Sequence, residues 1–350
     1  MRVAVLADIH GNLPACEAVL EDIARVAPDY IVAAGDLALR GAHPRETVEL
    51  LFDRCDALLM GNTDCYLAGN YLGGAYRERD HWKTELLRWT RDQLGEGLLQ
   101  RLGALPFSVR YSPRKGQDLY VCHANPKNLE ESLDPTLDDL AVRRFFQHLD
   151  AAACAFGHLH FPYRRRVGRL LIADVASAGI PRDGDLRPAY GVFTFTPKGW
   201  RVQIRRVRYP VRKATQAITA RRVPGGPLLI HKLVEARYRH HAALMEAARR
   251  HSGLPPAALS ARGGPGIHGA HGPHGPRAPH VAPLAPCDLP PGEVDPALLH
   301  DGPHDLNDPL PDAAEDAGAH GDESGAGASG IADAGGGEPG PQGTGTSFDP

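Results

Sequence analysis

The chain of 350 residues has 39 basic and 42 acidic side chains and a formal charge of -3, values typical of an ordinary soluble protein. No apolar run reaches the length of a membrane span, and six cysteines without CxxC spacing do not form the framework of a disulfide-rich protein. Because the first residues also lack the pattern of a secretory signal, we expect a cytoplasmic protein with no membrane partner.

The charge is distributed unevenly along the chain. Residues 278–350 contain 14 acidic and no basic side chains, whereas residues 1–277 contain 39 basic and 28 acidic ones, a net charge of +11. The last part is rich in Gly, Pro, Ala, Ser and Asp, and its apolar surface is too small to offset the entropy lost on folding. We therefore predict a main folded domain at 1–210, a basic helical extension at 211–262, and a disordered tail at 263–350 that is first Gly/Pro/His-rich and then acidic.

The first part of the chain alternates between two kinds of pattern. The apolar runs at 2–7, 30–34 and 57–60 are typical of strands that are buried on both faces. The segments at 13–25 and 46–52 have apolar residues at helical spacing. Strands that alternate with helices in this way predict an α/β fold.

The remaining elements include more helices and then a region rich in strands. We expect helices at 81–94, 136–149 and 227–251, and strands near 107–111 and at 119–122, 151–156, 163–167, 170–173, 190–195 and 202–207. Two stacked sheets flanked by helices are the simplest architecture for this order of elements.

Short polar motifs follow five of the predicted strands. In chain order they are Asp8-Ile9-His10, Gly35-Asp36, Gly61-Asn62, His123 and Gly157-His158-Leu159-His160. Because ligands of parallel sheets collect at the carboxyl ends of the strands, we expect these residues to converge at one edge of one sheet. Two-metal sites need a bridging carboxylate with ligands on either side, and this mixture of imidazoles and oxygens favours manganese, iron or zinc.

Each motif alone has a simpler explanation. An aspartate at a strand end often caps the next helix, and a glycine such as Gly35 can serve only a tight turn. Asn62 is compatible with ordinary turn chemistry, and His123 with a hydrogen-bonded core position. No structural explanation requires all of them together, so the complete set favours a metal site.

As a set, the motifs resemble those of the calcineurin-like metallophosphoesterase superfamily in order and spacing, over about residues 1–196. The segments 8–12 and 177–184 are similar to those of its compact bacterial and archaeal, phosphodiesterase-like members. The resemblance implies a four-layer α/β/β/α sandwich, in which two sheets are flanked by helices, with the catalytic domain at 1–210. It also implies a phosphoric ester hydrolase.

The resemblance further implies a role for each matching residue. One metal ion would be held by Asp8, His10 and His160, the second by Asn62, His123 and His158, and Asp36 would bridge the two. A hydroxide held between the ions would attack the phosphorus, so Asp36, Asn62 and His123 are also expected to be catalytic. Mn²⁺ is the expected metal, with Fe²⁺, Zn²⁺, Ni²⁺ or Mg²⁺ as alternatives.

Four residues are expected to contact the substrate: Asn12, Thr63, Asp64 and Arg164. Thr63 stands where many members of the superfamily have a histidine that protonates the leaving group, and a threonine hydroxyl is too weak an acid for that role. This change favours phosphodiesters over phosphomonoesters. Asp64, or His81 at the start of a predicted helix, is an alternative proton donor.

The leading expectation is a two-metal phosphoesterase that acts on phosphodiesters, or alternatively on phosphomonoesters or nucleotides. A catalytically weak scaffold that binds protein partners is a second reading, which the intact ligand set disfavours. A metal-dependent nuclease is a third, favoured by the many basic residues at 200–250 but disfavoured by the few aromatic side chains there. An alternative for the basic residues is a solvated helix that packs on the main domain, and no oligomeric state is predicted.

Overall fold

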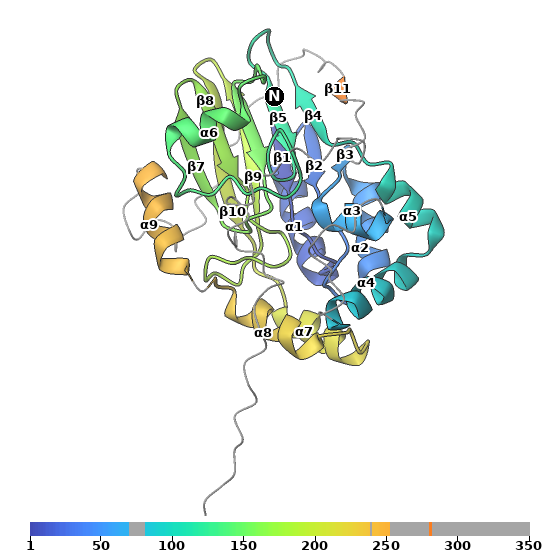
Figure 1. Ribbon diagram of the computed structural model, residues 1–350. Coiled ribbons are helices and arrows are strands. Elements are labelled where there is room, and N and C mark those ends of the chain that lie inside the picture. The colour runs from blue at the N-terminus through green and yellow to red at the C-terminus, as the bar shows by residue number, and fades with distance from the viewer. Residues whose placement is uncertain (70–80, 239, 253–279, 282–350) are drawn as a thin grey trace, which may run out of the picture. The chain divides into compact units, whose positions relative to one another are not determined.

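In the computed structural model, two β-sheets face each other and helices cover their outer faces (Figure 1). The structure describes residues 1–69, 81–238, 240–252 and 280–281, which all belong to one compact unit that spans residues 1–308. Apart from residues 280–281, the predicted tail at 263–350 lies outside the described residues. The order of layers confirms the predicted α/β/β/α sandwich.

The first sheet has the strand order β10-β9-β1-β2-β3. Its strands are β1 (Arg2–Leu6), β2 (Tyr30–Ala34), β3 (Ala57–Leu59), β9 (Ala189–Thr196) and β10 (Gly199–Arg206). The strands β1, β2 and β3 are parallel, whereas β9 is antiparallel to β1 and to β10.

The second sheet has the strand order β11-β4-β5-β6-β8-β7. Its strands are β4 (Ser108–Tyr111), β5 (Leu119–Cys122), β6 (Ala153–Phe156), β7 (Tyr163–Val167), β8 (Leu170–Asp174) and β11 (His280–Val281). Here β5, β6 and β8 are parallel, and the edge strands β4 and β7 run antiparallel to their neighbours. The strand β11 pairs with β4 in a region for which no fold is predicted from the sequence.

Helices on the first sheet are α1 (Leu13–Val26), α2 (Pro44–Arg54), α3 (Asn62–Ala68), α4 (His81–Leu94), α5 (Glu96–Gly103), α7 (Val211–Ala220) and α8 (Gly226–Glu235). The second sheet is covered by α6 (Asp139–Phe145) and α9 (His241–Ser252). Figure 1 shows α7 and α8 across the end of the sandwich at which β1 and β2 finish.

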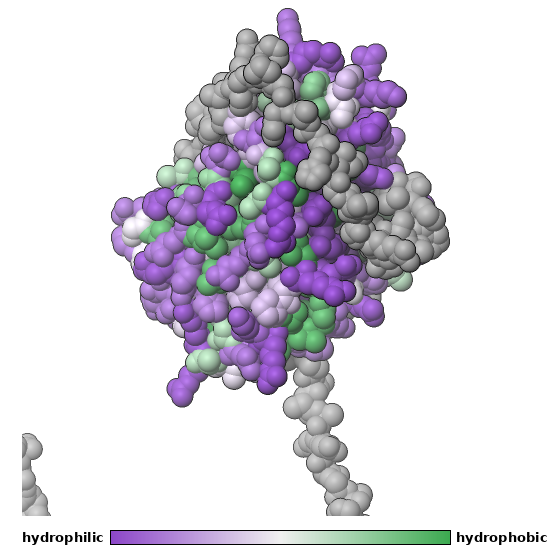
Figure 2. Space-filling model, turned by 180° about the vertical axis from the view of Figure 1, so that it is seen from behind, coloured by the Kyte–Doolittle hydropathy of each residue, from purple (hydrophilic) through white to green (hydrophobic). Residues whose placement is uncertain are grey.

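Alternation along each strand produces three apolar layers. In β1, Val3 and Val5 point between the sheets, where they pack with residues of the second sheet such as Val121. Ala4 and Leu6 point the other way, into the layer under the helices. Because both faces of these strands are buried, their sequences are continuous apolar runs. Seen from behind, the described surface is mostly hydrophilic, with apolar side chains in small groups (Figure 2).

The predicted helix at 227–251 is wrong, because the chain forms two helices there. Helix α8 ends at Glu235, and the next residue, Ala236, caps it in a left-handed conformation with a φ of 51°. The carbonyl oxygen of Ala236 accepts a hydrogen bond from Gly184 N, and Arg237 pairs with Asp183 in an isolated β-bridge. These tertiary contacts break a pattern that is helical in sequence. Within the described residues, no helix has the length and apolar character needed to span a membrane.

The layer under α1 gives a direct test of the fold. Leu20 on α1 is 2% exposed, whereas Leu140 on α6 is 63% exposed. We expect Leu20→Ala to lower the free energy of unfolding by about 2–5 kcal/mol, because it leaves a cavity in the core. The matched change Leu140→Ala should alter it by less than about 0.5 kcal/mol. Chemical denaturation of both variants measures the difference, and equal losses would contradict the described packing.

Candidate metal centre

The polar motifs meet where the carboxyl ends of the two sheets lie together. The first sheet places Asp8, His10, Asp36 and Asn62 after β1, β2 and β3, and the second places His123, His158 and His160 after β5 and β6. The expectation that they share one edge of one sheet is therefore wrong. Each sheet contributes one part of the set because the two sheets are packed face to face.

A first group of ligand atoms comes from Asp8, His10, Asp36 and His160. All four residues are buried, and one donor atom from each lies within 4.8 Å of the others. His10 Nε2 is 3.1 Å from His160 Nε2 and 3.5 Å from Asp36 Oδ2, and His160 Nε2 is 3.3 Å from Asp8 Oδ1. This arrangement has the size of the ligand shell of one metal ion.

A second group lies on the other side of Asp36. His123 Nε2 is 3.1 Å from Asn62 Oδ1 and 3.2 Å from His158 Nδ1. The same His123 nitrogen is 3.5 Å from Asp36 Oδ1, whereas the first group faces Asp36 Oδ2. The two oxygens of one carboxylate therefore face two separate groups of ligands.

Hydrogen bonds determine which histidine nitrogens carry hydrogen in the first group. His10 Nδ1 lies 2.8 Å from the Leu39 carbonyl oxygen, and His160 Nδ1 lies 2.7 Å from that of Ile180. Because a carbonyl only accepts, each Nδ1 is the donor, and in the neutral rings both Nε2 atoms present lone pairs. Two lone pairs at 3.1 Å repel each other unless a cation lies between them.

The second group repeats this pattern. His123 Nδ1 is 2.9 Å from the Ala34 carbonyl oxygen, and His158 Nε2 is 2.8 Å from that of Glu130. In the neutral rings the remaining nitrogens, His123 Nε2 and His158 Nδ1, therefore face each other with lone pairs. Both groups consequently have the donor chemistry of a divalent cation site.

Charge around the ligands also fits bound cations. Burial, together with Arg40 and His160, lowers the pKa of His10 well below its ordinary value, so this ring is neutral. Although burial opposes it, the Asp36 and Asp8 carboxylates raise the pKa of His123. Buried carboxylates need compensating positive charge, which metal ions supply without a proton on a ligand nitrogen.

Asp8 provides a further indication. Its Oδ2 accepts a hydrogen bond of 2.8 Å from His158 N, whereas its Oδ1 is buried and has no hydrogen-bond partner. That oxygen is the one that faces His160 Nε2. An unpaired carboxylate oxygen in the interior is costly unless a cation binds it.

The backbone is strained at the ligands. Asp8, His10, Asp36, His158 and His160 have φ values between 51° and 70°, in the left-handed region that such residues rarely adopt. Strained residues of this kind cluster at functional sites, where the surrounding structure holds them in place.

Two glycines, which have no side chain, leave room for the carboxylates of Asp36 and Asp8 beside the backbone. A Cβ on Gly61 would lie 2.3 Å from Asp36 Oδ1, and one on Gly157 would lie 2.3 Å from Asp8 Oδ2. Any side chain at either position would collide with a ligand. The glycines in the sequence motifs therefore have a packing role at the metal centre.

Asp64 supports the loop that carries Asp36. Its carboxylate accepts hydrogen bonds from Asp36 N at 2.8 Å, Leu37 N at 3.0 Å and Gly61 N at 3.0 Å. Burial and the neighbouring Asp36 raise the pKa of Asp64 to about 7. Since its oxygens are directed at backbone N–H groups, these contacts favour a positioning role over the predicted contact with substrate.

The turn at 177–184 supports the first group from the other side. Ser177 Oγ donates to the Asp8 carbonyl oxygen at 2.6 Å and accepts from Ile180 N at 2.6 Å. The Ile180 carbonyl in turn accepts from His160 Nδ1. This turn therefore fixes the backbone of one ligand and the ring of another.

Glu130 is a supporting residue that the sequence does not reveal. Its Oε2 accepts from Asn62 Nδ2 at 3.3 Å, and its Oε1 accepts a short hydrogen bond from the Tyr66 hydroxyl. Because the amide nitrogen of Asn62 is held by Glu130, the amide oxygen is turned toward His123. No periodic pattern or motif marks this glutamate, which lies in the long loop after β5.

The other residues expected to contact substrate occupy different places. Thr63 N donates to Asp36 Oδ1 at 2.9 Å, and the buried Thr63 Oγ1 has no hydrogen-bond partner. Asn12 caps α1 and lines a pocket beside His10. Arg164 lies on β7, where its Nη1 donates to the Val202 carbonyl oxygen of β10 at 3.3 Å, and it is not among the residues that line this pocket.

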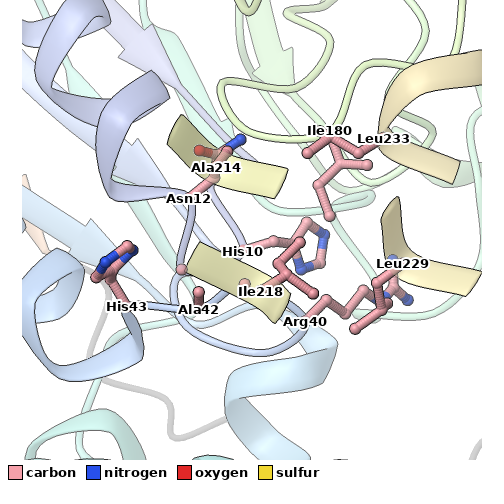
Figure 3. Close-up of a pocket in the computed structure, with 12 residues that line it drawn as sticks. His10, Asn12, Arg40, Ala42, His43, Ile180, Ala214, Ile218, Leu229 and Leu233 are labelled. Carbon is pink, nitrogen blue, oxygen red and sulfur yellow. The ribbon is translucent and has the colours of Figure 1, made fainter. Parts of the chain in front are cut away.

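This pocket is open beside the first group of ligands. It lies between the loops 10–12 and 40–43 and the helices α7 and α8 (Figure 3). Two of its residues, Arg40 and His43, follow the Asp36 motif closely in sequence, but no pattern distinguishes them there. Most of the apolar residues come from α7 and α8, in the region that the sequence predicts as a basic helical extension, whereas Ala42 and Ile180 come from loops.

Comparisons with known proteins agree with this geometry. Residues 1–162 match the calcineurin-like phosphoesterase family. The uncharacterized protein MJ0912 of Methanocaldococcus jannaschii is 31% identical over 240 residues, which are 63% of this chain and 93% of that protein.

Solved structures have the same fold. A metallophosphoesterase from Sphaerobacter thermophilus is 27% identical with a TM-score of 0.55, over 67% of this chain and 100% of that one. The hypothetical protein PH1004 from Pyrococcus horikoshii OT3 is 18% identical with a TM-score of 0.57, over 67% of this chain and 98% of that one, and this likeness concerns the fold alone.

The two groups predict two separable metal ions. We expect His160→Ala and His158→Ala each to remove about one ion per chain, because each histidine belongs to a different group. Elemental analysis after gel filtration measures the content, and Mn²⁺ titration of each variant shows which site remains. The exposed His148→Ala should keep the wild-type content. If both ligand variants retained that content as well, the assignment of these residues would be wrong.

Because Glu130 contacts only one of the two groups, its substitution should weaken the binding of one ion only. We expect Glu130→Ala to weaken the ion held by Asn62 about 10- to 100-fold, as loss of a supporting hydrogen bond typically does, because the amide can then rotate. Glu130→Gln, which keeps one acceptor oxygen, should lose less. Mn²⁺ titration by calorimetry separates the two sites, and the exposed neighbour Glu131→Ala is the control. Equal weakening of both ions would show that Glu130 only stabilises the fold.

Proposed function

Because the chain belongs to the calcineurin-like phosphoesterase family and is a metal-dependent phosphoric ester hydrolase, we propose that it cleaves phosphodiesters with two divalent metal ions. The observation that carries this proposal is the pair of facing nitrogen lone pairs on each side of Asp36, at 3.1 Å and 3.2 Å. A carboxylate shared between two such groups is what a two-metal hydrolase requires.

The ligand sets follow from the two groups of atoms. One ion would be held by Asp8, His10, Asp36 and His160, and the other by Asp36, Asn62, His123 and His158. Mn²⁺ is the proposed metal for this mixture of imidazole and oxygen donors, and Fe²⁺, Zn²⁺, Ni²⁺ and Mg²⁺ are the alternatives. When bound, such ions polarise the phosphoryl oxygens and lower the pKa of a coordinated water.

The protein contributes orientation and charge to this chemistry. Although burial opposes it, His123, Arg40 and His158 lower the pKa of Asp36, so it remains a carboxylate. The guanidinium of Arg40, which lines the pocket beside His10, attracts the negative phosphoryl group. Because both aspartates and three of the histidines are almost completely buried, bulk water has little access to the ligand atoms.

The leaving group determines which esters can react. Thr63 occupies the position of a proton donor, but its hydroxyl is a poor acid near neutral pH. Asp64 cannot readily take over, because its carboxylate oxygens accept three backbone N–H groups. The side chain of His81 lies outside the described part of the structure. Esters whose alcohols are acidic enough to leave unaided are therefore the preferred substrates, which favours aryl phosphodiesters or comparable nucleotide derivatives.

Ion pairs argue against the alternative of a nuclease. In the basic region, Arg205 pairs with Asp22 at 2.8 Å, Arg250 with Glu246 at 3.2 Å, and Arg206 with Asp183 at shorter range. Arginines held in this way are less available to a phosphate backbone. The alternative of an inactive scaffold is disfavoured by the complete set of seven proposed ligand side chains, five of which are held at the cost of backbone strain.

A hydrolysis assay tests the proposed function. We expect the full-length protein, stripped of metal and supplied with Mn²⁺, to hydrolyse bis(p-nitrophenyl) phosphate faster than p-nitrophenyl phosphate and much faster than dialkyl phosphates. Asp36→Asn should reduce kcat at least tenfold, because both ions share this carboxylate.

The exposed Asp53→Asn is the matched control and should retain wild-type kcat. Thermal unfolding checks that Asp36→Asn still folds. Rates independent of metal would refute the two-metal proposal. Faster hydrolysis of the monoester, or equal rates for aryl and alkyl diesters, would refute the preference for aryl phosphodiesters.

A further inference from the structure

The pocket beside His10 has two chemically different sides. Its polar side chains, such as His10, Arg40 and His43, come from the loops after β1 and β2, and most of its apolar ones, such as Ile218, Leu229 and Leu233, come from α7 and α8 (Figure 3). We call these its polar and apolar sides. Resting on the proposed function, we infer that this pocket binds the organic group of the substrate and selects an apolar, aryl-sized group over a sugar or a small alkyl group.

The polar side of the pocket is suited to an anion. It contains Arg40, and no carboxylate is among the described residues that line the pocket. Arg40 adopts a φ of 94°, which is rare for a residue with a side chain and indicates that the loop is held in this shape. His10, which belongs to the ligand set, connects this side of the pocket to the place where the phosphoryl group would react.

The side-chain amide of Asn12 already makes its hydrogen bonds within the protein, so it has little capacity to bind a substrate hydroxyl. Its Nδ2 donates to the Gly179 carbonyl oxygen at 2.8 Å and to the Tyr209 hydroxyl at 3.3 Å, and its Oδ1 accepts from Ala15 N at 3.4 Å. The amide hydrogens are thus already used within the protein. A sugar in this pocket would place hydroxyl groups against aliphatic side chains without partners, which is unfavourable.

The apolar side is built into the fold. Ala214, Ile218, Leu229 and Leu233 are each at most 6% exposed, and they belong to the apolar layer that also contains α1 and α2. An apolar group that enters the pocket therefore meets a surface continuous with the protein core. Apolar pockets with a few polar groups at one end are typical of small-molecule sites.

Two arginines hold the apolar helices over the ligand loops. Arg221 at the end of α7 donates from Nη1 to the Ala42 carbonyl oxygen at 2.9 Å. The buried Arg182, in the turn that fixes Asp8 and His160, donates from Nη1 to the Lys232 carbonyl oxygen of α8 at 3.0 Å. The position of the apolar side is thereby set relative to the metal ligands, as discrimination by size requires.

Binding of two stable phosphonates tests this inference without catalysis. Phenylphosphonate carries an aryl group and methylphosphonate a small alkyl group, while their anionic ends are similar. We expect the Mn²⁺-supplied wild-type protein to bind phenylphosphonate at least about tenfold more tightly, measured by calorimetry, as differences of one or more methylenes in an apolar pocket typically produce.

Two variants separate the sides of the pocket. Ala214→Leu adds three carbon atoms within the pocket and should abolish most of the preference for phenylphosphonate, whereas the same change at the exposed Ala220 of α7 should leave it intact. Arg40→Met keeps most of the side-chain volume without the charge, so it should weaken both phosphonates by a similar factor. Thermal unfolding confirms that each variant is folded.

The outcomes distinguish this inference from the proposed function. Equal affinities of the wild-type protein for the two phosphonates, or an unchanged preference in Ala214→Leu, would overturn the assignment of the pocket even if aryl phosphodiesters were hydrolysed. A lost preference in Ala214→Leu and a retained one in Ala220→Leu would support it. These binding results would stand even if no phosphodiester were cleaved, in which case the proposed function alone would fail.

Discussion

The buried carboxylate of Asp36 is shared by two groups of ligands, and the rest of the site is arranged around it. One oxygen faces His10 and the other faces His123, both at 3.5 Å. Two buried carboxylates would be strongly unfavourable without positive charge nearby. One oxygen of each aspartate accepts a backbone hydrogen bond: Asp36 accepts from Thr63 N, and Asp8 accepts from His158 N. The remaining lone pairs are directed at the places where cations fit.

Holding ligands in this way requires a rigid support. The strands end immediately before the ligand loops, and the loops then turn through left-handed conformations that are unfavourable for aspartate and histidine. Asp64 and Ser177 compensate through hydrogen bonds to the backbone of the ligand loops. Because both sheets are packed on both faces, the strand ends cannot shift to relieve the strain. The rigid sandwich thus determines the geometry of the candidate metal centre.

Much of this arrangement is predictable from the sequence, for a specific physical reason. Strands buried on both faces leave continuous apolar runs, and polar residues directly after them, such as Asp8 and His123, must lie at a sheet end. The helix expected at 227–251 is different, because its break at Ala236 depends on a contact with Gly184 that no local pattern encodes. The roles of Glu130 and Arg40 are likewise not predictable from the sequence, since each residue lies in a loop and its role depends on which side chains the fold brings beside it.

The metal ligands and the apolar side of the pocket come from different parts of the chain. All seven proposed ligands lie within residues 1–162, the part that matches the family. Ile180 and the pocket residues of α7 and α8 follow that part. Under the proposed function, phosphoryl transfer would depend on the first part, and the pocket residues of the second part would select the size and polarity of the organic group. Proteins that share the ligands but differ in these helices should therefore keep the reaction and differ in the ester that they accept, because neither helix supplies a ligand atom.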